Sequence, residues 1–172
     1  MAPTVRKLAL SAHLAFSVGW IGGIVAYLVL GGAAILSDEA ATVRAAWAAM
    51  EIVGWYAIVP LAGASLVTGI VMALGTKWGL FRHYWVVISF LITVVCVAVL
   101  VLHMPSVTST AAAAAYARGA ALDGLGGDLP HPAAGLVLLL VVLVLNVHKP
   151  RGLTRYGWRK QQTADAASRE PA

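Results

Sequence analysis

The chain has 172 residues, of which 60% are hydrophobic and 11% are charged. A soluble domain usually carries about 25% charged residues, so this composition favours a membrane protein over a soluble enzyme. The formal net charge is +5, but the basic residues are sorted by predicted membrane side, which argues against nucleic acid as a partner.

Four apolar blocks predict four transmembrane helices, because each is close to the length that crosses about 30 Å of hydrocarbon. The first block covers about 8–36 and is too long for the apolar part of a signal peptide, so we interpret it as an uncleaved span. The second covers about 45–74 and contains Pro60, which is expected to kink the helix. The third and fourth blocks cover about 85–107 and 132–149.

The remaining segments connect or follow these spans, and residues 1–160 are predicted to form a single transmembrane domain. The segment 108–131 is expected to be a loop. Its Ala-rich part, 110–122, is expected to form a short surface helix, which ends at the Gly- and Pro-containing segment 124–130. The basic and aromatic residues after the last span suit anionic lipid headgroups. Residues 161–172 are expected to be disordered.

Basic residues are distributed unequally between the two predicted membrane sides. Ten lie on the side of the two termini, whereas Arg44 and Arg118 lie on the other. Since Lys and Arg are retained on the cytoplasmic side, this bias predicts a multi-pass plasma-membrane protein with both termini cytoplasmic. Trp78 and Trp85 are predicted to mark the inner membrane boundary, and Trp47 the outer one. The ten basic residues are Arg6, Lys7, Lys77, Arg82, Lys149, Arg151, Arg155, Arg159, Lys160 and Arg169.

Helical spacing predicts which faces point into the bundle, because a polar side chain facing lipid is costly. Gly19 and Gly23 form a GxxxG pattern, which is typical of close helix packing, and Asn146 is expected to hydrogen-bond between helices. One face of the second span carries Glu51, Trp55, Ile58, Ala62, Ser65, Gly69 and Met72. One face of the third span carries Ser89, Thr93, Cys96, Leu100 and His103.

Two histidines lie at the outer ends of predicted spans that a single loop joins. His103 ends the third span and His131 begins the fourth, so similar depth in the membrane is expected. Facing imidazoles can ligate a haem iron. With Glu51 and Met104 near the same level, they can instead form a site for copper or another transition metal. The third interpretation is that both are interfacial residues with ordinary hydrogen bonds.

The other three histidines lie toward the predicted cytoplasmic side. His13 is about 8–13 Å into the membrane at 1.5 Å per residue, and an intramembrane ionisable residue suggests function. It is interpreted either as a ligand of a second, inner haem, partnered by His83 or His148, or as a bundle histidine bonded to a carbonyl or serine. His83 and His148 are expected to contact lipid headgroups.

A motif on the first helix joins His13 to Trp20 and the Gly22-Gly23 pair. It resembles the opening helix of CopD-like copper-resistance membrane proteins and of related small haem-associated membrane families. The resemblance implies that His13 is a metal or haem ligand, although a Met-rich outer face, which copper transport would favour, is absent. The wider chain resembles a family of uncharacterised actinobacterial four-helix membrane proteins, which implies the topology. The stretches that carry the wider resemblance are 78–85, 101–103, His131 with 135–136, and 149–152.

These observations predict an all-α, integral membrane four-helix bundle with the lipid bilayer as its partner. The leading functional hypothesis is a small haem b-binding redox protein that transfers electrons, with His103 and His131 as axial ligands and His13 at a second site. One alternative is a CopD-like protein that handles copper. Another is a cofactor-free accessory or scaffold subunit of a homo-oligomer or larger membrane complex. Pro60 is the single clue to a transporter, and enzymatic activity is left open.

Overall fold

The computed structural model describes residues 2–76 and 79–167, and the elements of this part of the chain are all helices. Lys77, Trp78 and Arg169 lie outside the described residues. Four helical runs are long and apolar enough to cross a membrane, which confirms the all-α fold class and the prediction of four long apolar helices. The four runs are Pro3–Leu36, Ala40–Gly75, Tyr84–Tyr116 and Pro130–His148.

The first run, α1 (Pro3–Leu36), begins earlier than predicted because Pro3 occupies the first turn, where its missing N–H costs nothing. Its GxxxG pattern packs against the second run, as predicted. A Cβ added to Gly19 would lie 3.3 Å from a Leu61 methyl group, and one added to Gly23 would lie 3.1 Å from Ile58 Cγ1. The glycines therefore allow the two helices to approach closely.

The second run is continuous but contains a widened turn. It consists of α2 (Ala40–Val53), the π-helical segment η1 (Gly54–Ile58) and α3 (Val59–Gly75). Pro60 follows η1 and has no N–H to donate to the preceding turn. The chain thus accommodates the predicted kink at Pro60 as a π-bulge, a common form of helix irregularity.

The π turn changes which residues of the second run face the interior. Met50, Gly54 and Ile58 are buried. Trp55, predicted to face inward, is 37% exposed and donates its indole N–H to Thr108 Oγ1 at 3.0 Å. That prediction is wrong because the extra residue in the turn rotates the helix face. Below the turn the prediction holds at two positions, the buried Ala62 and Ser65.

The third run, α4 (Tyr84–Tyr116), extends well past its predicted end at 107. Pro105 does not stop the helix, and the alanines at 111–115 are strong helix formers that continue it. The separate surface helix predicted at 110–122 is therefore wrong. Only the single turn α5 (Ala120–Asp123) remains, and it follows the positive-φ Gly119.

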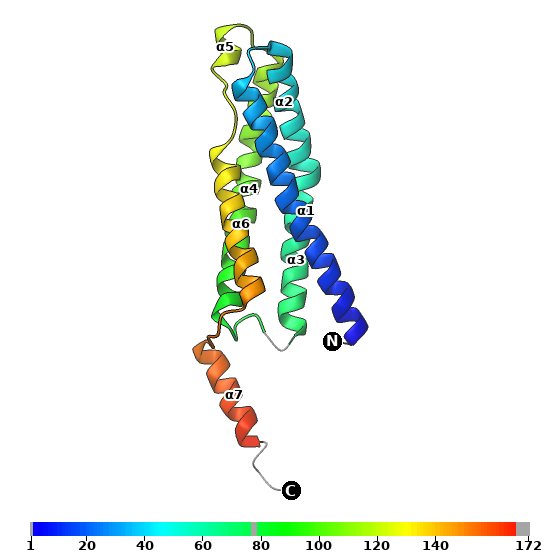
Figure 1. The fold of residues 1–172 in the computed structure, drawn as a ribbon, viewed down its shortest axis with the longest axis vertical. Coiled ribbons are helices and arrows are strands. Elements are labelled where there is room, and N and C mark those ends of the chain that lie inside the picture. Colours follow the sequence, from blue (N-terminus) through cyan, green and yellow to red (C-terminus); the bar gives the residue numbers. More distant parts are fainter. Residues whose placement is uncertain (1, 77–78, 168–172) are drawn as a thin grey trace.

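The fourth run, α6 (Pro130–His148), is much shorter than the others. At 1.5 Å per residue its 19 residues span about 28 Å, whereas the 33 residues of α4 span about 50 Å. The connection from α5 therefore descends along the bundle before α6 begins (Figure 1). This descent brings the start of α6 beside the middle of α4 rather than its end.

The last helix, α7 (Arg155–Ala167), corrects the prediction that the chain is disordered from residue 161. Its first turn is stabilised by Thr154, whose hydroxyl accepts a hydrogen bond from the Gly157 N–H at 3.1 Å. Residues 168–172 lie outside the described part of the chain. Both termini lie at the same end of the bundle (Figure 1).

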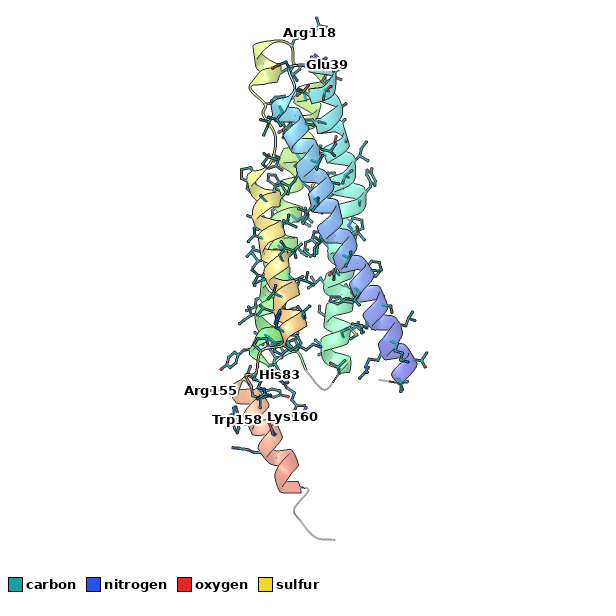
Figure 2. The ribbon with its side chains drawn as sticks, in the orientation of Figure 1. Glu39, His83, Arg118, Arg155, Trp158 and Lys160 are labelled. Carbon is teal, nitrogen blue, oxygen red and sulfur yellow. The ribbon has the colours of Figure 1, made fainter. Side chains whose placement is uncertain are left out.

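Charged residues gather at the two ends of the molecule. Figure 2 shows Arg155 and Lys160 on α7 at the end of the termini. Glu39 and Arg118 lie at the opposite end. The long apolar helices thus separate two polar ends, as a chain that crosses a bilayer requires.

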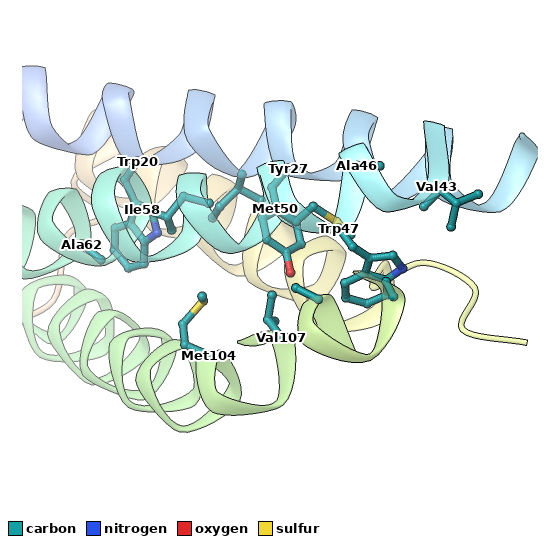
Figure 3. Close-up of a cluster of buried hydrophobic side chains, with 14 of the residues drawn as sticks. Trp20, Tyr27, Val43, Ala46, Trp47, Met50, Ile58, Ala62, Met104 and Val107 are labelled. Carbon is teal, nitrogen blue, oxygen red and sulfur yellow. The ribbon is translucent and has the colours of Figure 1, made fainter. Parts of the chain in front are cut away.

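The hydrophobic core is concentrated where α1, α2, η1 and α4 meet (Figure 3). Trp47 belongs to it, because it is only 4% exposed and donates its indole N–H to the Gly126 carbonyl at 3.1 Å. Trp47 is therefore a core residue, and its level relative to the outer membrane surface stays a prediction. Trp85, predicted at the inner boundary, is also buried. Further core members are Trp20, Ile24, Tyr27, Met50, Ile58, Ala62, Met104 and Val107.

The polar stripe of α4 faces the bundle as predicted. Ser89 and Cys96 are buried, and Thr93 is half-buried. Asn146 on α6 donates its side-chain N–H to Ser89 Oγ at 3.2 Å. This contact confirms the prediction that Asn146 links helices, here α6 to α4.

Candidate metal centre

Three residues from distant parts of the chain converge on one point. His103 lies on α4, His131 lies in the first turn of α6, and Asp128 lies in the connection just before α6. One ligand atom of each lies within 4.8 Å of the others. Two imidazoles and a carboxylate form a donor set that transition metals bind in proteins.

Asp128 is the centre of this group. Its Oδ2 lies 2.6 Å from His103 Nε2, and its Oδ1 lies 3.6 Å from His131 Nδ1. Tyr27 on α1 donates a hydrogen bond from its hydroxyl group to Asp128 Oδ2 at 3.0 Å. The Asp128 side chain is only 10% exposed, so this carboxylate is compensated by its neighbours rather than by water.

Glycines bring the segment before Asp128 against α1. A Cβ on Gly127 would overlap the carbonyl oxygen of Gly31, and a Cβ on Gly31 would lie 2.9 Å from a Leu129 methyl group. Gly126 adopts a positive φ of 57°, which glycine tolerates without strain. Together with the Trp47 hydrogen bond, these contacts fix the position of Asp128.

His131 is placed by the start of α6. Pro130 is the first helical residue, where its fixed φ favours helix initiation. The imidazoles of His103 and His131 stack with ring centroids 4.1 Å apart and planes inclined by 26°. Both rings therefore present a nitrogen to the same carboxylate from one side. His131 is the most accessible member of the group, with 56% of its side chain exposed.

Two cavities meet at His103 and Asp128. One, of about 320 Å³, runs along the bundle between α1, η1, α4 and α6 and is lined mainly by apolar side chains. The other, of about 180 Å³, lies toward α5 and has polar lining groups, among them Ser106 and Thr110. The polar cavity thus adjoins the group at His103 and Asp128.

The predicted site residues are only partly brought together. His103 and His131 form one group, and Met104 lines the apolar cavity beside them at 1% exposure. Glu51, the other predicted metal ligand, belongs neither to the group nor to the lining of either cavity. Its place is taken by Asp128, which sequence reasoning missed. The three-residue spacing of Asp128 and His131 was the signal that could have found it.

His13 lies elsewhere, between α1 and α3. Its Nδ1 is 3.1 Å from Thr68 Oγ1 and 3.2 Å from the Ser65 carbonyl oxygen. The Ser17 and Ser65 hydroxyls, 2.8 Å apart, continue this polar cluster. These contacts are those expected of a bundle histidine bonded to a neighbouring helix.

His83 and His148 lie at the end of the bundle near the termini. His83 precedes α4 as its N-cap residue. His148 ends α6, and its Nδ1 lies 3.1 Å from the Val144 carbonyl oxygen. Neither belongs to the group around Asp128.

The stacked geometry of His103 and His131 does not suit two axial ligands of one haem. Axial ligands bind iron from opposite faces of the porphyrin, so the ring plane must pass between them. Rings stacked at 4.1 Å and both turned toward Asp128 leave no such plane. A single ion bound from one side fits their arrangement.

A scan against protein-family models and searches of curated proteins and of solved structures found no match to this chain. The resemblances to CopD-like proteins and to the actinobacterial four-helix family therefore stay predictions.

Proposed function

We propose that this protein binds one divalent transition-metal ion through His103, Asp128 and His131, and that it handles this ion within a membrane. The observation that carries the proposal is the convergence of both imidazoles on a single, nearly buried carboxylate. Four apolar helices of membrane-spanning length support a multi-pass membrane location.

The donor set indicates which ions fit. Imidazole nitrogen suits zinc, copper, iron and nickel, whereas calcium and magnesium prefer all-oxygen sites. Three protein ligands leave a coordination position open for water or a substrate. Zn²⁺ and Cu²⁺ are the ions we expect.

Only a small adjustment is needed to close the site around an ion. Bonds of about 2.0–2.1 Å in a tetrahedral site hold ligand atoms roughly 3.4 Å apart. The present ligand atoms lie within 4.8 Å of one another. His131, the most exposed of the three, can approach the ion, whereas His103 Nε2 and Asp128 Oδ2, now 2.6 Å apart, must separate to admit it. Tyr27 keeps its hydrogen bond to Asp128, as the outer partner that orients a ligating carboxylate.

The charge bias supports a location of the site in the outer half of the membrane. Both termini lie at one end of the bundle, and the start of α6, where His131 lies, is the end of that helix farther from the termini (Figure 1). If the basic end is cytoplasmic, as the distribution of Lys and Arg predicts, the polar cavity opens toward the exterior. This orientation suits an ion taken from outside the cell.

The test is metal binding by the full chain, purified in detergent and stripped with a chelator. Titration calorimetry with Zn²⁺ and with Cu²⁺, joined by elemental analysis, should give one ion per chain. Replacement of Asp128 by Asn should weaken binding by more than about tenfold, since even outer-shell changes cost that much. Acidification should release the ion, because protons compete for the imidazoles.

Matched variants control for charge and for histidine number. Asp38→Asn alters an exposed carboxylate and His148→Ala alters the exposed histidine at the other end of α6, so both should bind normally. His131→Ala should bind more weakly than His148→Ala. A chain that binds neither ion, or variants that all bind alike, would contradict the proposal. A Soret band in the purified protein would favour haem instead.

A further inference from the structure

The chain that follows the last span is held against the start of α4. The backbone N–H of Thr154 donates to the Arg82 carbonyl at 3.0 Å, and that of Tyr84 donates to the Gly152 carbonyl at 3.3 Å. A Cβ added to Gly157 would overlap the Arg82 carbonyl oxygen, so this side of α7 packs directly on that backbone. These contacts fix where α7 begins relative to α4 and α6.

The length of α6 indicates the level of this segment in a membrane. At 1.5 Å per residue its 19 residues span about 28 Å, close to the ~30 Å thickness of the hydrocarbon core. A bilayer crossed by α6 therefore has one hydrocarbon boundary near Pro130 and the other near His148. The residues after His148 lie at the level of the lipid headgroups, and α7 extends from there away from the bundle (Figure 1).

The segment from Lys149 to Thr163 carries charge of a single sign. It has five basic residues and no acidic residue, and all five basic side chains are exposed. Arg155 and Arg159 are four residues apart on α7, a spacing at which like charges destabilise a helix. An anion outside the chain would remove this repulsion. The five basic residues are Lys149, Arg151, Arg155, Arg159 and Lys160.

Aromatic rings accompany these charges on α7. Trp158 is 58% exposed and Tyr156 is 56% exposed, although α7 is polar overall. Trp158 shares one side of the helix with Arg155 and Arg159, because residues three and four apart are neighbours (Figure 2). That side is turned away from the contact made by Gly157, which is two residues from each arginine. Amphipathic rings of this kind are typical of the membrane–water interface.

We propose that the basic surface formed by Arg151, Arg155, Arg159 and Trp158 binds anionic phospholipids. Each guanidinium can donate two parallel hydrogen bonds to a lipid phosphate. A lipid with net negative charge is favoured over a zwitterionic one, whose ammonium group would lie among like charges. Lipid fits better than an acidic protein, because the surface begins where two spans end and carries an exposed indole. It lies at the opposite end of α6 from the metal group and does not depend on metal binding.

The experiment places the full chain in phosphatidylcholine nanodiscs and measures energy transfer from α7 to labelled lipid. A donor dye is attached at Thr163→Cys, an exposed position, in a Cys96→Ala background. Acceptor-labelled phosphatidylglycerol should associate more tightly than acceptor-labelled phosphatidylcholine at low salt, and 0.5 M salt should reduce the difference. Each basic residue near an anionic surface contributes about fivefold, so Arg155→Gln with Arg159→Gln should lower the preference about 5–25-fold.

Arg6→Gln with Lys7→Gln is the matched control. It removes the same charge from exposed residues at the same end of the molecule, but on α1, so the preference should be unchanged. Equal association of both lipids, or an equal loss in the two double variants, would overturn the inference. In the first case the basic surface would be left to an acidic protein. Loss of the preference on addition of inorganic phosphate, at constant ionic strength, would also overturn it and indicate a site for free phosphate.

Discussion

Tyr27 is a residue whose effect on the proposed metal centre is indirect. Its hydroxyl donates to the Asp128 oxygen that also lies 2.6 Å from His103 Nε2. It therefore orients the carboxylate on which both histidines converge. Carboxylate ligands in metal sites are held by such outer hydrogen bonds, and removing one typically costs about 10–100-fold in affinity.

Replacing Tyr27 by Phe should weaken Zn²⁺ binding by about 10–100-fold while preserving the number of ions per chain. The ring stays in the core, so only the hydrogen bond is lost. Titration calorimetry measures the change. Tyr116→Phe is the control, since Tyr116 is 87% exposed at the end of α4. Equal affinity in the two variants would show that Asp128 does not rely on Tyr27.

At the residue scale the sequence revealed two of the three residues of the candidate site. His103 and His131 stood out because each ends a predicted span. Asp128 did not, because a loop carboxylate is ordinary in sequence and its burial depends on the contact between Gly127 and Gly31. Such a contact joins residues far apart in the chain, so it cannot be predicted from local sequence patterns.

The π turn η1 acts at the scale of elements. It allows Gly54 to face α4, where Met104 packs directly against it. A Cβ on Gly54 would lie 2.5 Å from Met104 Cε and 2.7 Å from Sδ. Met104 is almost fully buried, so its side chain can yield only toward the cavity that it lines and would lose its present packing.

Gly54→Ala should therefore destabilise the protein by roughly 1–3 kcal/mol, the usual cost of overpacking a core. Thermal unfolding in detergent, followed by circular dichroism, measures the loss. Gly63→Ala is the matched control, because its Cβ meets nothing within 4 Å and alanine favours a helix. Similar melting of the two variants would mean that the packing at Gly54 does not limit stability.

Hydrophobicity and helix signals predicted the four long elements, since span length follows from bilayer thickness. They did not predict the face of Trp55, because a single inserted residue turns a helix by about 100° and leaves composition unchanged. The Ala-rich end of α4 was predicted as a separate helix. Alanine favours helix formation, but its presence does not show whether an Ala-rich segment continues the preceding helix or starts a new one.

The whole molecule has its termini at one end and the connections α1–α2 and α4–α6 at the other (Figure 1). With the basic residues concentrated at the end of the termini, the chain should insert with that end in the cytoplasm. The other three helical runs are longer than α6. The part of α4 near Tyr116 carries small polar residues such as Ser109, which suit contact with water.

Cysteine labelling tests this orientation in a Cys96→Ala background, which removes the single native thiol. Ser109→Cys should react with a membrane-impermeant maleimide on intact cells, whereas Thr163→Cys on α7 should react only after permeabilisation. Both positions are exposed, so access to the reagent decides the outcome. The reverse pattern would place the metal centre in the cytoplasmic half.

The short fourth span has a consequence for how the protein is made. Asp128 and His131 both follow α4, so a growing chain that has inserted its first three spans carries His103 alone. A lone imidazole holds a divalent ion weakly, and tight capture must await the arrival of α6. Metal loading would then report that insertion is complete, and unfinished chains would be left unloaded during biosynthesis.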